Sequence, residues 1–172
     1  MDQILLGTAI AFIITFAAIP IIIQVSNAKK LFDHPDERKI HVSPIPSLGG
    51  LGIFAGFILA CLFTISLYNA PDFQYFYAAT LVIFFLGLKD DILVLSPMKK
   101  FIGQMLAAFL IVYKGGLVIH SMHGFLGVHE LPEAFSLAFT YVTLIVIINS
   151  FNLIHGVDGL AGSLGVMTSW VV

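Results

Sequence analysis

Long apolar runs separated by short polar connections are the feature that most constrains how this chain can fold. The first run extends from Ile4 to Val25. As a helix with a rise of about 1.5 Å per residue, a run of this length crosses the ~30 Å hydrocarbon core of a bilayer. Further apolar runs cover residues 48–68, 75–88, 101–113, 135–148 and 160–172. The pattern predicts an all-α fold, a polytopic integral membrane bundle of about six transmembrane helices.

Composition agrees with a membrane location and excludes several classes of protein. Of the 172 residues, 59% are hydrophobic and 10% are charged, whereas soluble domains carry about 25% charged residues. The 8 lysines and arginines and the net charge of -2 leave no large basic surface for a nucleic acid. Cys61 is the single cysteine, so the chain has no internal disulfide. A cleaved signal peptide is the alternative for the first run, but that run is long and has no basic segment before it.

The last apolar run is short for a membrane span. Residues 160–172 reach only about 20 Å as a helix, and neither a basic flank nor a polar tail follows them. We therefore expect residues 1–172 to form a single transmembrane domain that is the N-terminal part of a longer multi-span protein. A re-entrant last segment is the alternative.

The positions of lysine and arginine predict the orientation of the bundle. If six crossings alternate sides, the connections 27–47, 89–100 and 149–159 share one face. They hold seven of the eight basic residues, and only Lys114 lies on the other side. By the positive-inside rule, these three connections are cytoplasmic and the N-terminus is outside.

The connection on the opposite face, residues 114–132, contains glycines and histidines among scattered apolar residues. This composition fits either a hairpin or a segment that lies on the membrane surface. Its three histidines, His120, His123 and His129, could bind a metal. Their spacing matches no known metal-binding motif, so we interpret them as loop polarity.

Asp90 and Asp91 are the first candidate site on the cytoplasmic face, directly after the end of a predicted apolar helix. Two adjacent carboxylates repel each other and resist desolvation at a membrane boundary. A divalent cation or a nearby lysine would stabilise them. Mg²⁺ prefers oxygen ligands and keeps waters and substrate phosphates in its shell. A solvated helix end is the alternative.

A second polar cluster, Asn149, Asn152, His155 and Asp158, follows at steps of three residues. Asn149 and Asn152 would share one face if the fifth helix extends that far. Amide side chains both donate and accept hydrogen bonds, which suits a sugar, a base or a phosphate oxygen. A polar helix cap is the alternative.

Basic side chains supply a third set of candidates. Arg38 and His41 precede a stretch rich in proline and glycine, where cations can bind phosphate and the backbone can approach closely. Lys100 is either a basic flank of a membrane helix or a phosphate ligand. A basic flank is also the alternative for the first-loop residues.

Gly52 and Gly56 form a GxxxG motif in the second apolar run. Glycines four residues apart lie on one helix face and let another backbone approach. The motif therefore predicts close packing of this helix against a neighbour.

Taken together, three polar stretches resemble the signatures of a known family. They are Asp33–Gly50, Gly87–Gln104 and Asn149–Leu160. In their order along the chain and in their amino-acid sequence, they resemble the signatures of the polyprenyl-phosphate N-acetylhexosamine-1-phosphate transferases, the multi-span bacterial enzymes of glycosyltransferase family 4. The first stretch, with Arg-Lys-x-His before Pro-Ile-Pro-x-x-Gly-Gly, resembles the branch that uses N-acetylglucosamine.

The resemblance implies a reaction and a location. A UDP-N-acetylhexosamine, most simply UDP-GlcNAc, would donate its sugar 1-phosphate to undecaprenyl phosphate and release UMP. This step starts cell-envelope polysaccharide synthesis and requires Mg²⁺ or Mn²⁺. The enzyme would lie in the bacterial plasma membrane with its active site on the cytoplasmic face. The expected partners are the two substrates and the lipid bilayer, with a homodimer as a further candidate and no nucleic acid.

The resemblance also implies roles for individual residues. Asp90 and Asp91 would be catalytic, and together with Asp158 they would bind the metal. The substrate-binding residues would be Arg38, His41, Lys100, Asn149, Asn152 and Asp158.

Two departures from the family pattern leave an alternative open. His155 stands where the third signature usually has an aspartate, and histidine prefers softer metals than Mg²⁺. The later cytoplasmic motifs of the family are absent from these 172 residues, so the chain alone is expected to be inactive. The alternative is a degenerate, non-catalytic membrane homologue or scaffold.

Overall fold

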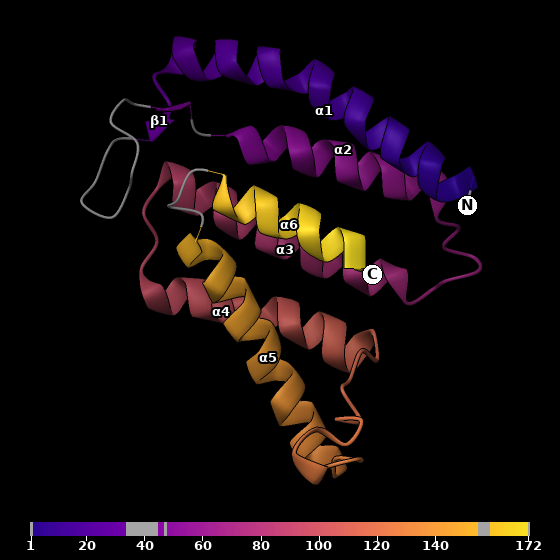
Figure 1. The fold of residues 1–172 in the computed structure, drawn as a ribbon. Helices are drawn as coiled ribbons and strands as arrows, with labels where there is room; N and C mark the ends of the chain where they lie inside the picture. The colour runs from indigo at the N-terminus through magenta and orange to yellow at the C-terminus, as the bar shows by residue number, and fades with distance from the viewer. Residues whose placement is uncertain (1, 34–44, 47, 155–158, 172) are drawn as a thin grey trace. The chain divides into compact units, whose positions relative to one another are not determined.

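The computed structural model describes residues 2–33, 45–46, 48–154 and 159–171, and helices dominate it (Figure 1). Two strands of two residues each, β1 (Phe32–Asp33) and β2 (Ile45–Pro46), pair with each other. Each predicted apolar run is confirmed as a helix, and the all-α class is confirmed with them. The helices are α1 (Asp2–Lys29), α2 (Gly49–Thr64), α3 (Phe73–Ile92), α4 (Pro97–Phe109) with its π-helical extension η1 (Leu110–Lys114), α5 (Glu133–Ile154) and α6 (Leu160–Val171).

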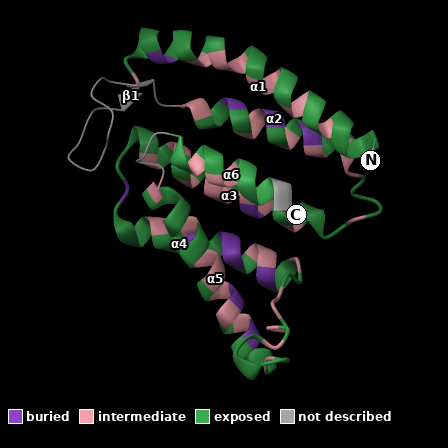
Figure 2. Cartoon of the chain, in the orientation of Figure 1, coloured by how far each residue is buried: buried purple, intermediate pink, exposed green. Residues whose placement is uncertain are grey.

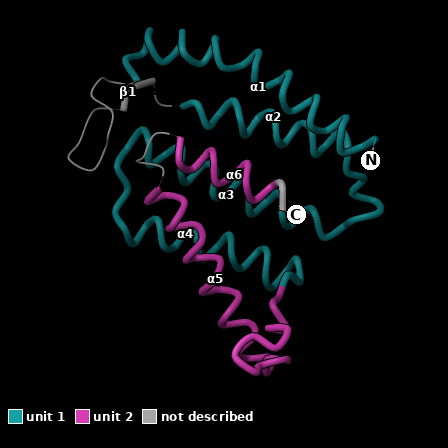
Figure 3. Tube along the Cα trace, in the orientation of Figure 1, with its two compact units in different colours: residues 1–33, 46–117 teal, residues 34–45, 118–172 magenta. Residues whose placement is uncertain are grey.

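The chain divides into two compact units (Figure 3). Unit 1 comprises residues 1–33 and 46–117 and so contains α1 to α4. Unit 2 comprises residues 34–45 and 118–172 and contains α5 and α6. The single transmembrane domain stays a prediction.

Several helix ends lie beyond the apolar runs that predict them. The first helix continues through Pro20 to Lys29. The third helix ends at Ile92, so Asp90 and Asp91 lie in its last turn and the expectation that they follow the helix is wrong. The fourth begins at Pro97, because proline is well tolerated in the first helical turn, where its missing N–H would have no partner.

The helices carry exposed residues along their length (Figure 2), and many of these residues are large and apolar. Among the described helices, only α1 and α5 are long and apolar enough to cross a membrane. Of the apolar 18-residue segment in each of them, 0% and 6% is buried. A core helix of a soluble protein would be mostly buried. The apolar helices α2 and α6 are shorter. This exposure is that of a membrane protein, and the count of six spans stays a prediction.

The GxxxG motif packs α2 against α1, as its spacing predicts. Gly52 and Gly56 are buried on α2, and the Thr15 hydroxyl of α1 donates a hydrogen bond to the Gly52 carbonyl at 3.3 Å. A Cβ at Gly56 would lie 2.3 Å from the Thr15 Oγ1 atom and 2.7 Å from the Ala11 carbonyl oxygen. Only glycine allows this approach of the two backbones.

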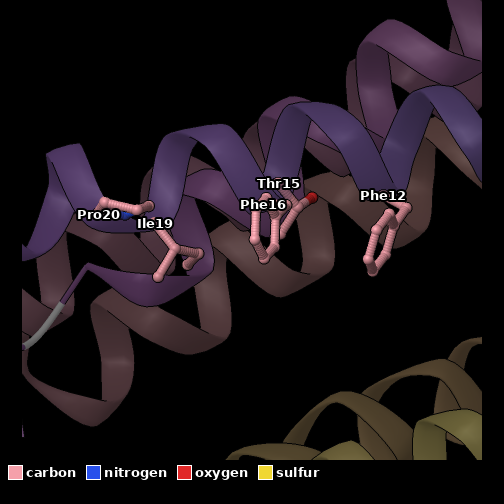
Figure 4. Close-up of a pocket in the computed structure, with 5 residues that line it drawn as sticks. All are labelled: Phe12, Thr15, Phe16, Ile19 and Pro20. Atoms are coloured by element: carbon pink, nitrogen blue, oxygen red, sulfur yellow. The ribbon is translucent and has the colours of Figure 1, made fainter.

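One hollow of about 300 Å³ lies on α1 (Figure 4). Side chains from successive turns of that helix line it: Phe12, Thr15, Phe16, Ile19 and Pro20. None of them is ionisable, so the hollow offers no charged group for a phosphate or a metal ion. The candidate chemistry lies instead at the end of α3.

Candidate active site

Asp90 joins the end of α3 to the start of α4. Its Oδ1 atom accepts a hydrogen bond from the Leu95 N–H at 2.9 Å. Its Oδ2 atom lies 2.6 Å from the Nζ of Lys100. Both oxygens of the carboxylate therefore have partners, and these contacts close the turn between the two helices.

The local sequence explains why the turn brings these groups together. The last turn of α3 ends when the Leu93 N–H bonds to the Lys89 carbonyl at 2.7 Å, and Pro97 then starts α4. A Cβ at Gly103 would lie 2.8 Å from both Cδ atoms of Leu86. This glycine lets α4 pack closely on α3, so that Lys100 in its first turn reaches Asp90.

The ion pair is partly open to solvent. The side chains of Lys100 and Asp90 are 30% and 21% exposed. A pair at this level of exposure contributes only about 0–1 kcal/mol to stability. Its charges can therefore exchange partners at small cost when an anionic ligand or a cation arrives.

Asn149 and Asn152 lie in the last turns of α5, within unit 2. The helix continues to Ile154, so the condition for a shared face is met, and both side chains are exposed. The Asn149 amide donates a hydrogen bond to the Ile145 carbonyl at 2.8 Å. Beyond the helix, Gly159 has a φ of 76°, a left-handed conformation that favours glycine.

The described residues thus assemble part of the predicted site. Asp90 and Lys100 are in contact, and Asp91 is the next residue on α3. The predictions for Arg38, His41, His155 and Asp158 lie outside the described residues. Within the described part of the chain, no three His, Cys, Asp or Glu side chains gather to hold a metal ion. The metal site of Asp90, Asp91 and Asp158 stays a prediction.

Sequence reasoning missed the structural role of Gly103 and the hydrogen bond that the Leu95 N–H donates to Asp90. Leu95 is buried, with 8% exposure. The signal for this hydrogen bond is the short apolar stretch 92–95 after the two aspartates. A buried residue in such a stretch has a backbone N–H that needs an acceptor.

We expect Asp90→Ala to destabilise the protein by about 1 kcal/mol more than Asp90→Asn. Asparagine still offers an oxygen to the Leu95 N–H, whereas alanine leaves that donor without its acceptor. Denaturant unfolding of the detergent-solubilised protein measures the difference. Equal stability of the two variants would contradict a role for Asp90 in holding the turn.

Comparison with known proteins gives the family. The family model for glycosyl transferase family 4 matches residues 73–172. The chain is 32% identical over 172 residues to decaprenyl-phosphate N-acetylglucosaminephosphotransferase of Mycobacterium leprae, a match that covers 94% of this chain and 43% of the relative. It is 29% identical over 167 residues to undecaprenyl-phosphate alpha-N-acetylglucosaminyl 1-phosphate transferase of Yersinia pestis, covering 95% of this chain and 45% of the relative.

No solved structure matches the chain significantly. The chain spans about half the length of the curated relatives it matches. The matched segment begins at the start of α3 and includes the corner of Asp90, Asp91 and Lys100 as well as the asparagines of α5. The chain belongs to glycosyl transferase family 4.

Proposed function

We propose that the protein transfers N-acetylhexosamine 1-phosphate, most simply GlcNAc-1-phosphate, from a UDP-sugar to undecaprenyl phosphate. The observation that carries this proposal is the corner where Asp90 and Lys100 meet beside Asp91, within the family-matched segment. Relatives named as polyprenyl-phosphate N-acetylglucosamine phosphotransferases support the choice of acceptor and sugar. The product would start cell-envelope polysaccharide synthesis.

The reaction requires two anions to approach each other. An oxygen of the acceptor phosphate becomes bonded to the phosphorus that carries the sugar, and the bond from that phosphorus to UMP breaks. UMP leaves with the electron pair. Cationic groups held in fixed positions offset the repulsion and orient the phosphates for transfer. Lys100 supplies such a charge at the α3–α4 corner.

The acidic residues would hold the divalent metal that the family implies. Carboxylate oxygens of Asp90, Asp91 and Asp158 are the donors that Mg²⁺ or Mn²⁺ takes in proteins. When bound, the metal would neutralise phosphate charge. The Asp90 carboxylate could turn from Lys100 toward the cation, which leaves the lysine for a substrate phosphate.

The surroundings of the corner suit a lipid phosphate. Ile92, Leu93 and Val94 directly follow the aspartates and are 51%, 62% and 96% exposed. Apolar side chains at this place allow the polyprenyl tail to stay in hydrocarbon while its phosphate reaches Lys100. We propose that this corner lies at the cytoplasmic surface of the bacterial plasma membrane and that the chain crosses the bilayer several times.

The remaining predicted residues would bind the nucleotide sugar. The exposed amides of Asn149 and Asn152 can contact a sugar, a base or a phosphate oxygen. Arg38 and His41 would bind phosphate oxygens, and Asp158 would complete the site. A homodimer stays a prediction.

We expect Lys100→Gln to lower kcat/KM for UMP release by about 10–100-fold, because it removes one charge-assisted contact to phosphate. The assay uses the full-length gene product, since the chain spans about half the length of its relatives and the 172 residues alone are expected to release no UMP. Lys99→Gln is the matched control, since this lysine is exposed on the same helix turn. Equal losses in both variants would contradict a specific role for Lys100.

A degenerate homologue is the second candidate, and His155 favours it. We expect His155→Asp in the full-length protein to change the turnover rate less than tenfold if the native site tolerates histidine. A much larger gain would identify His155 as a lesion and support the non-catalytic interpretation. Steady-state UMP release at saturating Mg²⁺ separates the two results.

A further inference from the structure

The connection before α5 is a hairpin, one of the two forms that its composition allows. Backbone hydrogen bonds of 2.9 Å run from Leu131 N–H to the His120 carbonyl, from Met122 N–H to the His129 carbonyl and from Gly124 N–H to the Val128 carbonyl. Residues 125–127 form the tip. This hairpin belongs to the same unit as α5.

Two buried hydroxyl groups fix the base of the hairpin to α5. Ser136 and Thr140 are 0% and 2% exposed. Thr140 Oγ1 accepts a hydrogen bond from the Ile119 N–H at 2.9 Å, and the Ser136 hydroxyl donates one to the Ile119 carbonyl. Both backbone groups of Ile119 are therefore held by the first two turns of the helix. The hairpin cannot swing freely from the helix end.

The tip exposes two large apolar side chains. Phe125 is 64% exposed and Leu126 is 85% exposed. Leu126 has a φ of 53° and a ψ of 27°, a left-handed conformation that is unfavourable for a bulky side chain. Asparagine or glycine would adopt it more easily. A strained leucine that the chain leaves almost uncovered indicates a favourable contact outside the chain.

The position of the hairpin tip relative to α5 indicates what the exposed Phe125 and Leu126 side chains contact outside the chain. α5 is one of the two described helices that can cross a membrane, and Ser136 and Thr140 anchor the hairpin near its N-terminal end. Asn149 lies about 24 Å along the helix from Glu133, the first residue of α5, at a rise of ~1.5 Å per residue. The tip is thus held at the end of the span opposite the asparagines. Aromatic and apolar side chains at that level partition into the bilayer interface.

We propose that Phe125 and Leu126 insert into the boundary between headgroups and acyl chains, on the membrane face where α5 begins. The hairpin is then a rigid interfacial anchor that sets the depth of α5. This proposal is independent of the chemistry at the other end of the helix.

Tryptophan fluorescence in vesicles tests the insertion. Trp170, the single native tryptophan, is replaced by phenylalanine, and Phe125→Trp then reports on the tip. The purified chain is reconstituted in phosphatidylcholine vesicles with bromines at acyl carbons 6 and 7, or 11 and 12. We expect quenching by the shallow bromines to exceed quenching by the deep ones by at least twofold, with little quenching by aqueous iodide.

Leu126→Asn in the same reporter is the second variant. Asparagine tolerates the left-handed backbone, so the hairpin keeps its fold while the tip loses apolar surface. We expect shallow bromine quenching to fall at least twofold and iodide quenching to rise. Strong iodide quenching of the original reporter without bromine quenching would overturn the proposal. Protection from both quenchers would overturn it as well, because it would show that protein rather than lipid covers the tip.

Discussion

Replacing Asp90 with asparagine in the full-length protein is expected to abolish UMP release, with a loss of at least about 10²–10³-fold in kcat. The substitution keeps the size of the side chain and an acceptor for the Leu95 N–H. It removes the negative charge that pairs with Lys100 at 2.6 Å and that would contribute to the metal site. Release of UMP from UDP-GlcNAc in the presence of undecaprenyl phosphate and Mg²⁺ measures the effect.

Asp72→Asn is the matched control for this experiment. Asp72 is an exposed carboxylate next to the other end of α3, so its loss alters the charge of the protein equally. We expect its activity to stay within about twofold of the wild type, because surface charges distant from a site act weakly through solvent. Retained activity in Asp90→Asn would remove Asp90 from the proposed machinery.

Gly56→Ala is expected to destabilise the protein by about 1–3 kcal/mol through overpacking of the α1–α2 contact. The new Cβ would lie 2.3 Å from Thr15 Oγ1 and 2.7 Å from the Ala11 carbonyl oxygen. A threonine side chain can turn away, but a backbone carbonyl can move only if α1 moves. Denaturant unfolding in a mild detergent gives the change in the free energy of unfolding.

The same substitution at Gly50 provides the control for helix propensity. Gly50 is also in α2, and a Cβ there would meet no atom within 4 Å. Alanine is favoured over glycine in a helix by about 1 kcal/mol, so Gly50→Ala should not destabilise the protein. A stable Gly56→Ala variant would show that the two helices do not pack through the glycine motif.

The sequence was sufficient to predict the helices, whereas the roles of the candidate site residues stay predictions. The apolar run from Ile4 to Val25 is long enough for a bilayer and indicates α1 directly. The run 135–148 indicates a helix, but α5 reaches the length of a span only because it continues beyond that run to Ile154. The prediction that Asn149 and Asn152 share one helix face required the fifth helix to extend through both residues, and α5 does so because it ends at Ile154. The GxxxG spacing indicates a packing face, but which helix occupies that face depends on tertiary structure.

Other features could not be read from the sequence because they depend on how turns close. The contact between Asp90 and Lys100 requires the chain to reverse direction over residues 93–96. It also requires a glycine at position 103, because a Cβ there would collide with the Leu86 side chain. The polar residues after an apolar run suggested that α3 ends before its aspartates, whereas backbone hydrogen bonds extend it to Ile92. The left-handed Leu126 contradicts local preference and is visible only in the folded hairpin.

The most direct test of the central claim is the release of UMP by the full-length protein, reconstituted in lipid, from radiolabelled UDP-GlcNAc. We expect UMP and a lipid-linked sugar pyrophosphate to form in equal amounts, and only when undecaprenyl phosphate and a divalent cation (Mg²⁺ or Mn²⁺) are both present. Release that does not depend on the acceptor lipid, or no release under these conditions, would contradict the proposed phosphate transfer.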